Sequence, residues 1–176
     1  MAPKNKLASF EAAILPHLGS AYNYARFLLK NESDAEDVVQ ESYLRAFKYF
    51  QGYHGGDSRA WLFTIVRNTS YNLLQQNRSR QLVDSIDDST EVVDASSYSN
   101  PETVLRQRID ENLLRQAIEE LPITFREVLI LREMEELSYK EIGTLCDLPI
   151  GTVMSRLARG RARLHERLVG KVNQEI

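Results

Sequence analysis

Hydrophobic positions recur with the spacing of an α-helix along most of this chain, and no segment alternates as a strand would. Helical periodicity first covers 10–30, where Pro16 divides it, and then 34–50 and 58–78. It resumes at 101–120, 124–135, 138–145 and 149 to about 168. The sequence therefore predicts an all-α fold.

Local signals place the starts of several helices. A serine or threonine followed three residues later by glutamate predicts a capping box at three places. The pairs are Ser33 and Glu36, Thr124 and Glu127, and Ser138 and Glu141. Pro149 suits the first position of the last helix, because its fixed backbone angle favours a helix start.

Helical periodicity is absent from Leu82 to Asn100, a stretch rich in Ser, Asp and Thr. We interpret this stretch as an acidic, flexible linker. It separates two small helical domains, so the predicted organisation is an N-terminal helical bundle at 1–80, a linker at 81–100 and a C-terminal domain at 101–176.

The last two predicted helices form a helix-turn-helix, with the turn at 146–148. At about 100° per residue, Val153, Leu157, Gly160 and Leu164 share one stripe of the second helix, which packs inward. The opposite face combines small residues with arginines, as a helix that enters a DNA groove requires. The candidate DNA-binding residues are Met154, Ser155, Arg156, Ala158, Arg159, Arg161 and Arg163. The alternative is a solvated basic helix end.

The helix at 34–50 carries an apolar stripe for the core and a second face that should be polar. Leu44 lies on that second face among acids and amides. A lone exposed leucine needs no explanation, but a leucine rimmed by carboxylates also suits a partner that bears arginines. The candidate docking residues are Asp37, Gln40, Glu41, Leu44 and Lys48.

Aromatic and cationic residues gather around the glycine-containing loop at 51–57. Most of these rings belong to the core, and Trp61, next to Leu62 on the following helix, is the clearest core candidate. Tyr53 and His54 lie in the loop itself, where a ring is free to stack on an unpaired base. This cluster is a weaker signal for nucleic acid than the helix-turn-helix.

Composition limits the other possibilities. The net charge of −3 does not suggest a nucleic-acid partner, but the charges are polarised: all are acidic between Gln81 and Thr103, and all are arginines from Ile150 to His165. The single cysteine, Cys146, rules out a disulfide framework and is interpreted as a small buried hydrophobe. We expect no metal, no cofactor, no membrane insertion and a cytoplasmic protein.

Three segments together resemble the bacterial sigma factors of the extracytoplasmic-function (ECF) type, over nearly the whole chain. The segment DAEDVVQESYLRAF at 34–47 is similar to the family's polymerase-docking helix, and RAWLFTIVRN at 59–68 to its promoter-melting segment. The segment that starts at Leu121 and runs through both helices of the helix-turn-helix is similar to its DNA-binding domain. The order of the three segments is also that of the family.

The resemblance implies a specificity subunit of RNA polymerase, which is not itself an enzyme. It implies that the docking residues contact the clamp helices of the largest subunit of the core polymerase. It also implies that the loop and the helix after it open promoter DNA and capture a flipped base. The candidates for that role are Tyr53, His54, Asp57, Arg59 and Asn68. An anti-sigma factor is the expected regulator, and a stress or envelope signal the expected trigger.

Departures from the family pattern limit what the resemblance implies. The family often carries lysine or arginine where this chain has Met154, and a larger residue where it has Ala158, so the upstream promoter sequence is not transferable. A stand-alone helix-turn-helix repressor is the alternative function. The sequence offers it no dimerisation heptads and no evident ligand pocket. An enzyme is a third class, but no nucleophile elbow or phosphate loop is present.

Overall fold

The computed structural model describes residues 3–84 and 102–174, and every regular element in these two stretches is helical. In chain order the α-helices are α1 (Pro3–Ile14), α2 (Leu18–Leu29), α3 (Glu32–Tyr49), α4 (Ser58–Asp84), α5 (Glu102–Glu119), α6 (Ile123–Leu129), α7 (Tyr139–Cys146) and α8 (Ile150–Gln174). Short 3-10 helices lie at Leu15–His17 and Phe50–Gly52, and a π-helical turn at Ile130–Met134. The prediction of an all-α protein is confirmed.

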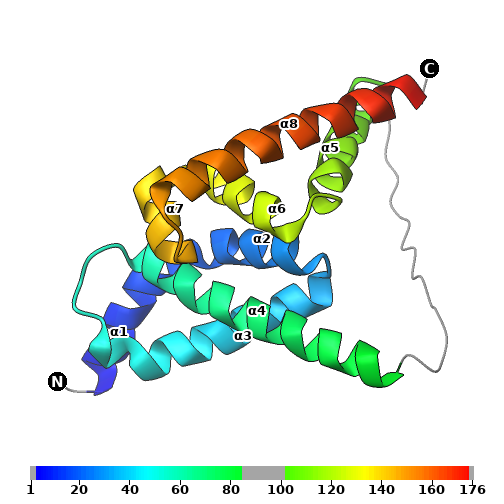
Figure 1. The fold of residues 1–176 in the computed structure, drawn as a ribbon. Helices are drawn as coiled ribbons and strands as arrows, with labels where there is room; N and C mark the ends of the chain where they lie inside the picture. The colour runs from blue at the N-terminus through cyan, green and yellow to red at the C-terminus, as the bar shows by residue number, and fades with distance from the viewer. Residues whose placement is uncertain (1–2, 85–101, 175–176) are drawn as a thin grey trace.

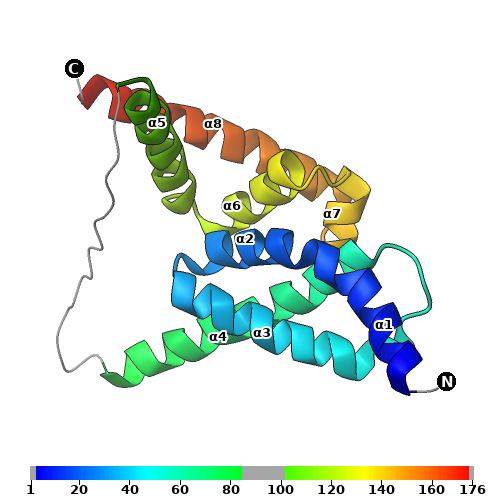
Figure 2. The ribbon, with the colours of Figure 1, turned by 180° about the vertical axis from the view of Figure 1, so that it is seen from behind.

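The helices form two layers (Figures 1 and 2). Helices α1 to α4 make one layer and α5 to α8 the other, with α2 against α6 and the start of α4 against α7. Buried apolar residues continue from one layer into the other as a single cluster, which includes Leu28 and Phe63 from the first layer and Val128 and Cys146 from the second. The two predicted domains are thus packed directly against each other, a contact that the sequence analysis did not anticipate.

The helix-turn-helix forms as predicted. Ser138 accepts a hydrogen bond from the backbone N–H of Glu141, and the Glu141 side chain accepts one from the backbone N–H of Ser138, which completes the capping box. Asp147 ends α7 in the left-handed conformation, with φ at 55°. Val153, Leu157 and Gly160 are buried on the inner stripe of α8 and Leu164 is half-buried.

Two of the predicted capping boxes are wrong. Helix α3 starts earlier than expected, and Asn31, not Ser33, caps it by accepting a hydrogen bond from the backbone N–H of Asp34. At the start of α6 the N-cap is Pro122, with no side-chain cap. Glu127 instead points away from the backbone of its own helix to three side chains of the other layer, which give its carboxylate stronger partners than the Thr124 backbone would.

Two predicted helix ends also differ from the structure, and one predicted helix changes type along its length. Helix α4 continues to Asp84, and α8 to Gln174, because no proline interrupts either segment. The segment expected to end at Glu135 changes to a π-helical turn after Leu129. Residues 81–84 of the predicted linker therefore belong to a helix, and the rest of the linker, 85–100, lies outside the described residues.

Gly143 is the position where the helix-turn-helix tolerates no side chain. A Cβ at this position would lie 2.8 Å from the backbone oxygen of Leu148, so α7 and the turn approach more closely than any other residue allows. We expect Gly143→Ala to lower the free energy of unfolding by about 1–3 kcal/mol, as overpacking does. Urea unfolding followed by circular dichroism measures this change.

The matched control is Gly170→Ala, because Gly170 lies within α8 and nothing lies within 4 Å of the point where its Cβ would be. That substitution should raise the free energy of unfolding by up to about 1 kcal/mol through helix propensity. Equal effects of the two substitutions would show that the close approach at Gly143 does not constrain the fold.

Cys146 is buried at the end of α7, as predicted. Burial, followed by the negative charge of Glu127, raises the pKa of its thiol to about 12. Because the thiolate is the reactive form, we expect a thiol reagent at pH 8 to label the native protein at least about a hundredfold more slowly than the guanidinium-unfolded chain. Comparable rates in the two states would mean that Cys146 is available for oxidation.

Candidate functional site

The predicted docking face is on the outer side of α3. Leu44 is 62% exposed, and the other candidates on this face are exposed too: Asp37, Gln40, Glu41 and Lys48. The opposite side of α3 buries Ala35, Val38, Ser42 and Ala46. The structure therefore brings the five docking candidates together on one side of the helix, with an unburied leucine among them.

A groove between α3 and α4 adjoins this face. Asp37 and Glu41 line it from α3, and Asn72 and Gln76 line it from α4. Glu41 forms an exposed ion pair with Arg45 four residues further along the same helix. Exposed pairs of this kind contribute little stability, so Glu41 is available to exchange Arg45 for another cation.

The loop before α4 is shaped by two glycines and by Asp57. Gly55 and Gly56 have φ values of 89° and 96°, which glycine adopts without strain. The Asp57 carboxylate accepts hydrogen bonds from the backbone N–H groups of Arg59, at 3.0 Å, and Ala60, at 3.2 Å. Asp57, a predicted promoter-melting residue, thus has a structural role at the start of α4, which the sequence analysis missed.

Tyr53 is held by its neighbours. Its ring stacks on Phe50 with centroids 5.6 Å apart and is tilted against Trp61 at 5.1 Å, while its hydroxyl donates a hydrogen bond to the Gly56 carbonyl. Trp61, the clearest core candidate, is only half-buried and lines a cleft between α4 and α7, whereas Leu62 beside it is fully buried. A base that stacked on Tyr53 would extend an existing stack.

The remaining promoter-melting candidates differ in exposure. His54 and Asn68 are exposed, the first in the loop and the second on α4. The Arg59 guanidinium donates a hydrogen bond of 3.0 Å to the backbone carbonyl of Glu135 in the other layer. Arg59 is therefore occupied in this conformation.

The outer face of α8 presents the predicted DNA-binding residues. Met154, Ser155, Ala158 and Arg159 are exposed, and Arg156 is half-buried beside them. Small side chains at 155 and 158 leave the backbone of the helix accessible over this stretch. The arrangement has the shape that a helix needs to approach base edges, as the periodicity predicted.

Two of the predicted DNA-binding arginines already have partners within the chain. Arg161 donates two hydrogen bonds to Glu133, at 3.0 and 2.6 Å, and Arg163 lies over the ring of Phe125 at 5.0 Å. Both partners belong to α6 and the π-helical turn after it, which no local pattern in α8 reveals. Arg161 and Arg163 thus hold α8 against α6 and the π-helical turn, and both side chains are exposed.

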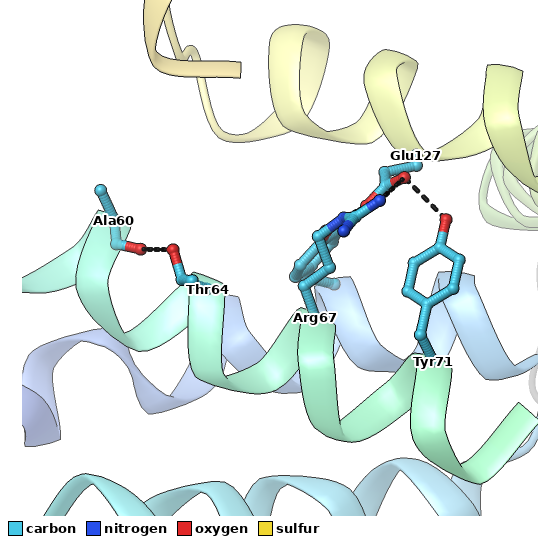
Figure 3. Close-up of polar contacts among 6 residues, drawn as sticks. Ala60, Thr64, Arg67, Tyr71 and Glu127 are labelled. Atoms are coloured by element: carbon cyan, nitrogen blue, oxygen red, sulfur yellow. Dashed lines mark hydrogen bonds and ion pairs between the residues drawn. The ribbon is translucent and has the colours of Figure 1, made fainter. Parts of the chain in front are cut away.

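A cluster that the sequence analysis missed lies between the layers, where the carboxylate of Glu127 enters from α6 (Figure 3). Tyr24 donates a hydrogen bond of 2.7 Å to it, Tyr71 donates one of 2.8 Å, and Arg67 forms an ion pair with it. Glu127 is only 1% exposed. A buried carboxylate requires such partners, so this cluster fixes how the layers meet.

The cluster also sets the protonation states of its members. Burial, and then the charge of Glu127, raise the pKa values of Tyr24 and Tyr71, so both phenols remain protonated donors. Burial opposes the charge of Arg67, but the hydrogen bond to Glu127 and its charge outweigh that effect and raise the pKa of the guanidinium. The cluster is thus a charged pair with two neutral donors.

Within the described ranges, no helix combines the length and the apolar character that crossing a membrane demands. The same residues hold no group of three or more His, Cys, Asp or Glu side chains with the geometry of a metal site.

Comparison with known proteins identifies both layers. The family model of sigma-70 region 2 matches residues 13–80, and that of sigma-70 region 4 matches residues 111–164. Region 2 therefore covers α2, α3 and most of α4, and region 4 covers α6, α7 and much of α5 and α8.

Individual relatives agree with the family models. The chain is 32% identical over 162 residues to the ECF RNA polymerase sigma factor SigE of Mycolicibacterium smegmatis, covering 92% of this chain but only 62% of that relative. It is 31% identical over 145 residues to the ECF RNA polymerase sigma-E factor of Salmonella typhimurium, covering 77% of this chain and 74% of the relative.

A solved structure resembles the whole arrangement of the described helices. It is the sigma factor RpoE in complex with the anti-sigma factor NepR from Bartonella quintana, with a TM-score of 0.74 and 28% identity. The match covers 91% of this chain and 96% of that one. On the combined evidence of the two region models and these relatives, the chain belongs to the ECF family of RNA polymerase sigma factors.

Proposed function

We propose that this protein is an alternative sigma factor that binds core RNA polymerase and directs transcription initiation at a specific set of promoters. The observation that supports this function most directly is the pair of exposed faces, one on α3 in region 2 and one on α8 in region 4. The first has the character of a protein-docking surface and the second that of a DNA-reading helix. In this proposal the protein directs RNA polymerase to promoters and does not itself catalyse a reaction.

The domains divide the work in this proposal. Residues 1–80 dock on the polymerase and open the promoter, residues 101–176 read the upstream element, and residues 81–100 link them. Each small domain binds DNA weakly, but tethering both to one polymerase raises the effective concentration of the second contact. This explains why a chain with a net charge of −3 acts on DNA: its arginines are concentrated on α8.

The docking role falls to Asp37, Gln40, Glu41, Leu44 and Lys48, which face the clamp helices of the largest polymerase subunit. Exposed carboxylates around Leu44 suit a basic partner surface, and Leu44 fills an apolar pocket at its centre. Tyr53, His54, Asp57, Arg59 and Asn68 act at the melted promoter, Asp57 chiefly by shaping the start of α4.

An anti-sigma factor controls this protein in the same proposal, and a stress or envelope signal releases it in the cytoplasm. Support comes from the RpoE relative of Bartonella quintana, which was solved in complex with the anti-sigma factor NepR and shares the arrangement of the described helices.

In vitro transcription with purified bacterial core polymerase tests the proposal. A pool of genomic fragments is transcribed with and without the protein, and we expect specific start sites only in its presence. Absence of both transcripts and core binding would reject the function and favour a stand-alone repressor, for which duplex sites selected by the protein alone are the next measurement.

The docking face yields a substitution test. The double variant Leu44→Ala with Asp37→Ala removes the apolar centre and one carboxylate, so its affinity for core polymerase should fall at least about tenfold, or about 1.4 kcal/mol. Fluorescence anisotropy with labelled protein measures the affinity. Val172→Ala is the control, because Val172 is a similarly exposed apolar residue at the far end of α8. Wild-type affinity of the folded double variant would refute the docking assignment.

Arg159 tests the reading of the upstream element. If its guanidinium makes a bidentate contact to a guanine, Arg159→Ala should weaken holoenzyme binding to the specific promoter by about 1–3 kcal/mol. The measurement compares the specific promoter with fragments altered at single upstream positions. A loss that is uniform across all sequences would instead assign Arg159 to a phosphate.

A further inference from the structure

The contact between regions 2 and 4 is built around a charge that needs both of them. Glu127 belongs to region 4, and the three side chains bonded to its carboxylate, Tyr24, Arg67 and Tyr71, all belong to region 2. Figure 3 shows Arg67 and Tyr71 reaching it from α4. Glu127 is 1% exposed and Tyr24 is fully buried. If region 4 moved away, the hydrogen bonds and the ion pair of Glu127 would break, and these polar groups would become hydrated.

Two further hydrogen bonds flank the Glu127 cluster. Arg126, which is 4% exposed, donates a hydrogen bond of 3.1 Å to the carbonyl of Leu28 at the end of α2. On the other side, Arg59 donates its bond of 3.0 Å to the carbonyl of Glu135. Arg126 of region 4 thus donates to region 2, and Arg59 of region 2 donates to region 4. Together with the bonds to Glu127, these contacts fix the relative placement of the two regions at three points.

In the closed arrangement, where regions 2 and 4 are packed together, region 4 engages Arg59, one of the five promoter-melting candidates, and leaves His54 and Asn68 exposed. Helix α7 lies over the start of α4, as both ribbon views show, and the cleft between them is lined by Ala60, Trp61 and Thr64 on one side and by Lys140 and Thr144 on the other. Arg59 is held by Glu135 at the same place. A DNA strand at the start of α4 would have to displace region 4.

The docking face on α3 is not covered in this way. Leu44 and most of the polar residues around it stay exposed while the regions are closed. Polymerase can therefore engage α3 first, before region 4 leaves α4. Closure blocks the use of promoter DNA without hiding the surface that recruits the polymerase.

We propose that the closed arrangement is an autoinhibited state of the free sigma factor. The bonds from Tyr24, Arg67 and Tyr71 to Glu127 hold it closed, and we call this set of contacts the latch. This inference rests on the proposed function and names a regulation of the same sites. The latch holds region 4 against the start of α4 until polymerase binding separates the regions. The population of the open state then sets how much of the free protein is competent, since apparent affinity falls with the competent fraction.

Single-molecule energy transfer tests the latch without polymerase. Dyes are attached at Glu36→Cys on α3 and Glu166→Cys on α8, both exposed, in a protein that also carries Cys146→Ala, because opening would expose the native thiol at the junction. We expect one compact population in the otherwise unchanged protein. Arg67→Met leaves the Glu127 carboxylate buried without its charged partner in the closed state, and should increase the open population at least about tenfold.

A second variant, Glu127→Gln, breaks the same ion pair from region 4 and keeps the shape of the side chain. It should shift the distribution in the same direction, and it preserves the test if Arg67→Met fails to fold. The matched controls break exposed ion pairs that lie within one region: Arg26→Met for the Arg26–Glu32 pair and Glu133→Gln for the Arg161–Glu133 pair. Both controls should stay compact.

Transcription then tests whether closure inhibits. The concentration of Glu127→Gln protein that gives half-maximal transcription should fall several-fold below that of the unchanged protein, because a larger fraction is competent. An open distribution in the unchanged protein, variants that stay compact, or opening without a lower half-maximal concentration would each overturn the latch. Absence of transcription by the unchanged protein would instead count against the proposed function, whatever the dye distances show.

Discussion

A buried carboxylate is the constraint on which the arrangement of this protein depends. Charge is expensive to bury unless it is paired and hydrogen-bonded, and the carboxylate of Glu127 is bonded to Tyr24, Arg67 and Tyr71 in the opposite region. Those partners come from α2 and α4, so both helices must lie at a defined distance from α6. The two layers are packed by apolar residues, but this charge fixes their register.

The sequence predicts several features that depend on residues three or four positions apart, although the box predicted at Ser33 is replaced by a cap at Asn31. The capping box at Ser138 and the buried stripe through Val153 and Leu157 are both confirmed, because their partners lie within one or two helical turns. The predicted box at Thr124 and Glu127 is wrong for the opposite reason. Glu127 has partners 103, 60 and 56 residues away in sequence, and nothing local shows that they will compete with the helix start.

The candidate site shows the same division. Helical periodicity alone predicts that Leu44 and Arg159 face solvent, and they do. Periodicity does not reveal that Arg161 is paired with Glu133 or that Arg59 reaches the carbonyl of Glu135, because both contacts depend on how helices pack. Residue type and face thus suffice to nominate a surface, while the availability of each side chain on it is decided by tertiary structure.

Polar contacts between regions 2 and 4 also affect how readily the two regions separate. An apolar side chain that leaves its core is exposed to water at full cost, whereas Glu127 and Arg67 regain hydration when they separate. Each region keeps apolar residues of its own, such as Ile14 and Val38 in region 2 and Leu137 and Leu157 in region 4, which need not be exposed when the regions part. Opening the junction also exposes apolar residues of the cluster that both layers share, such as Phe63 and Val128, so the closed state is held by apolar burial as well as by polar bonds that water can replace.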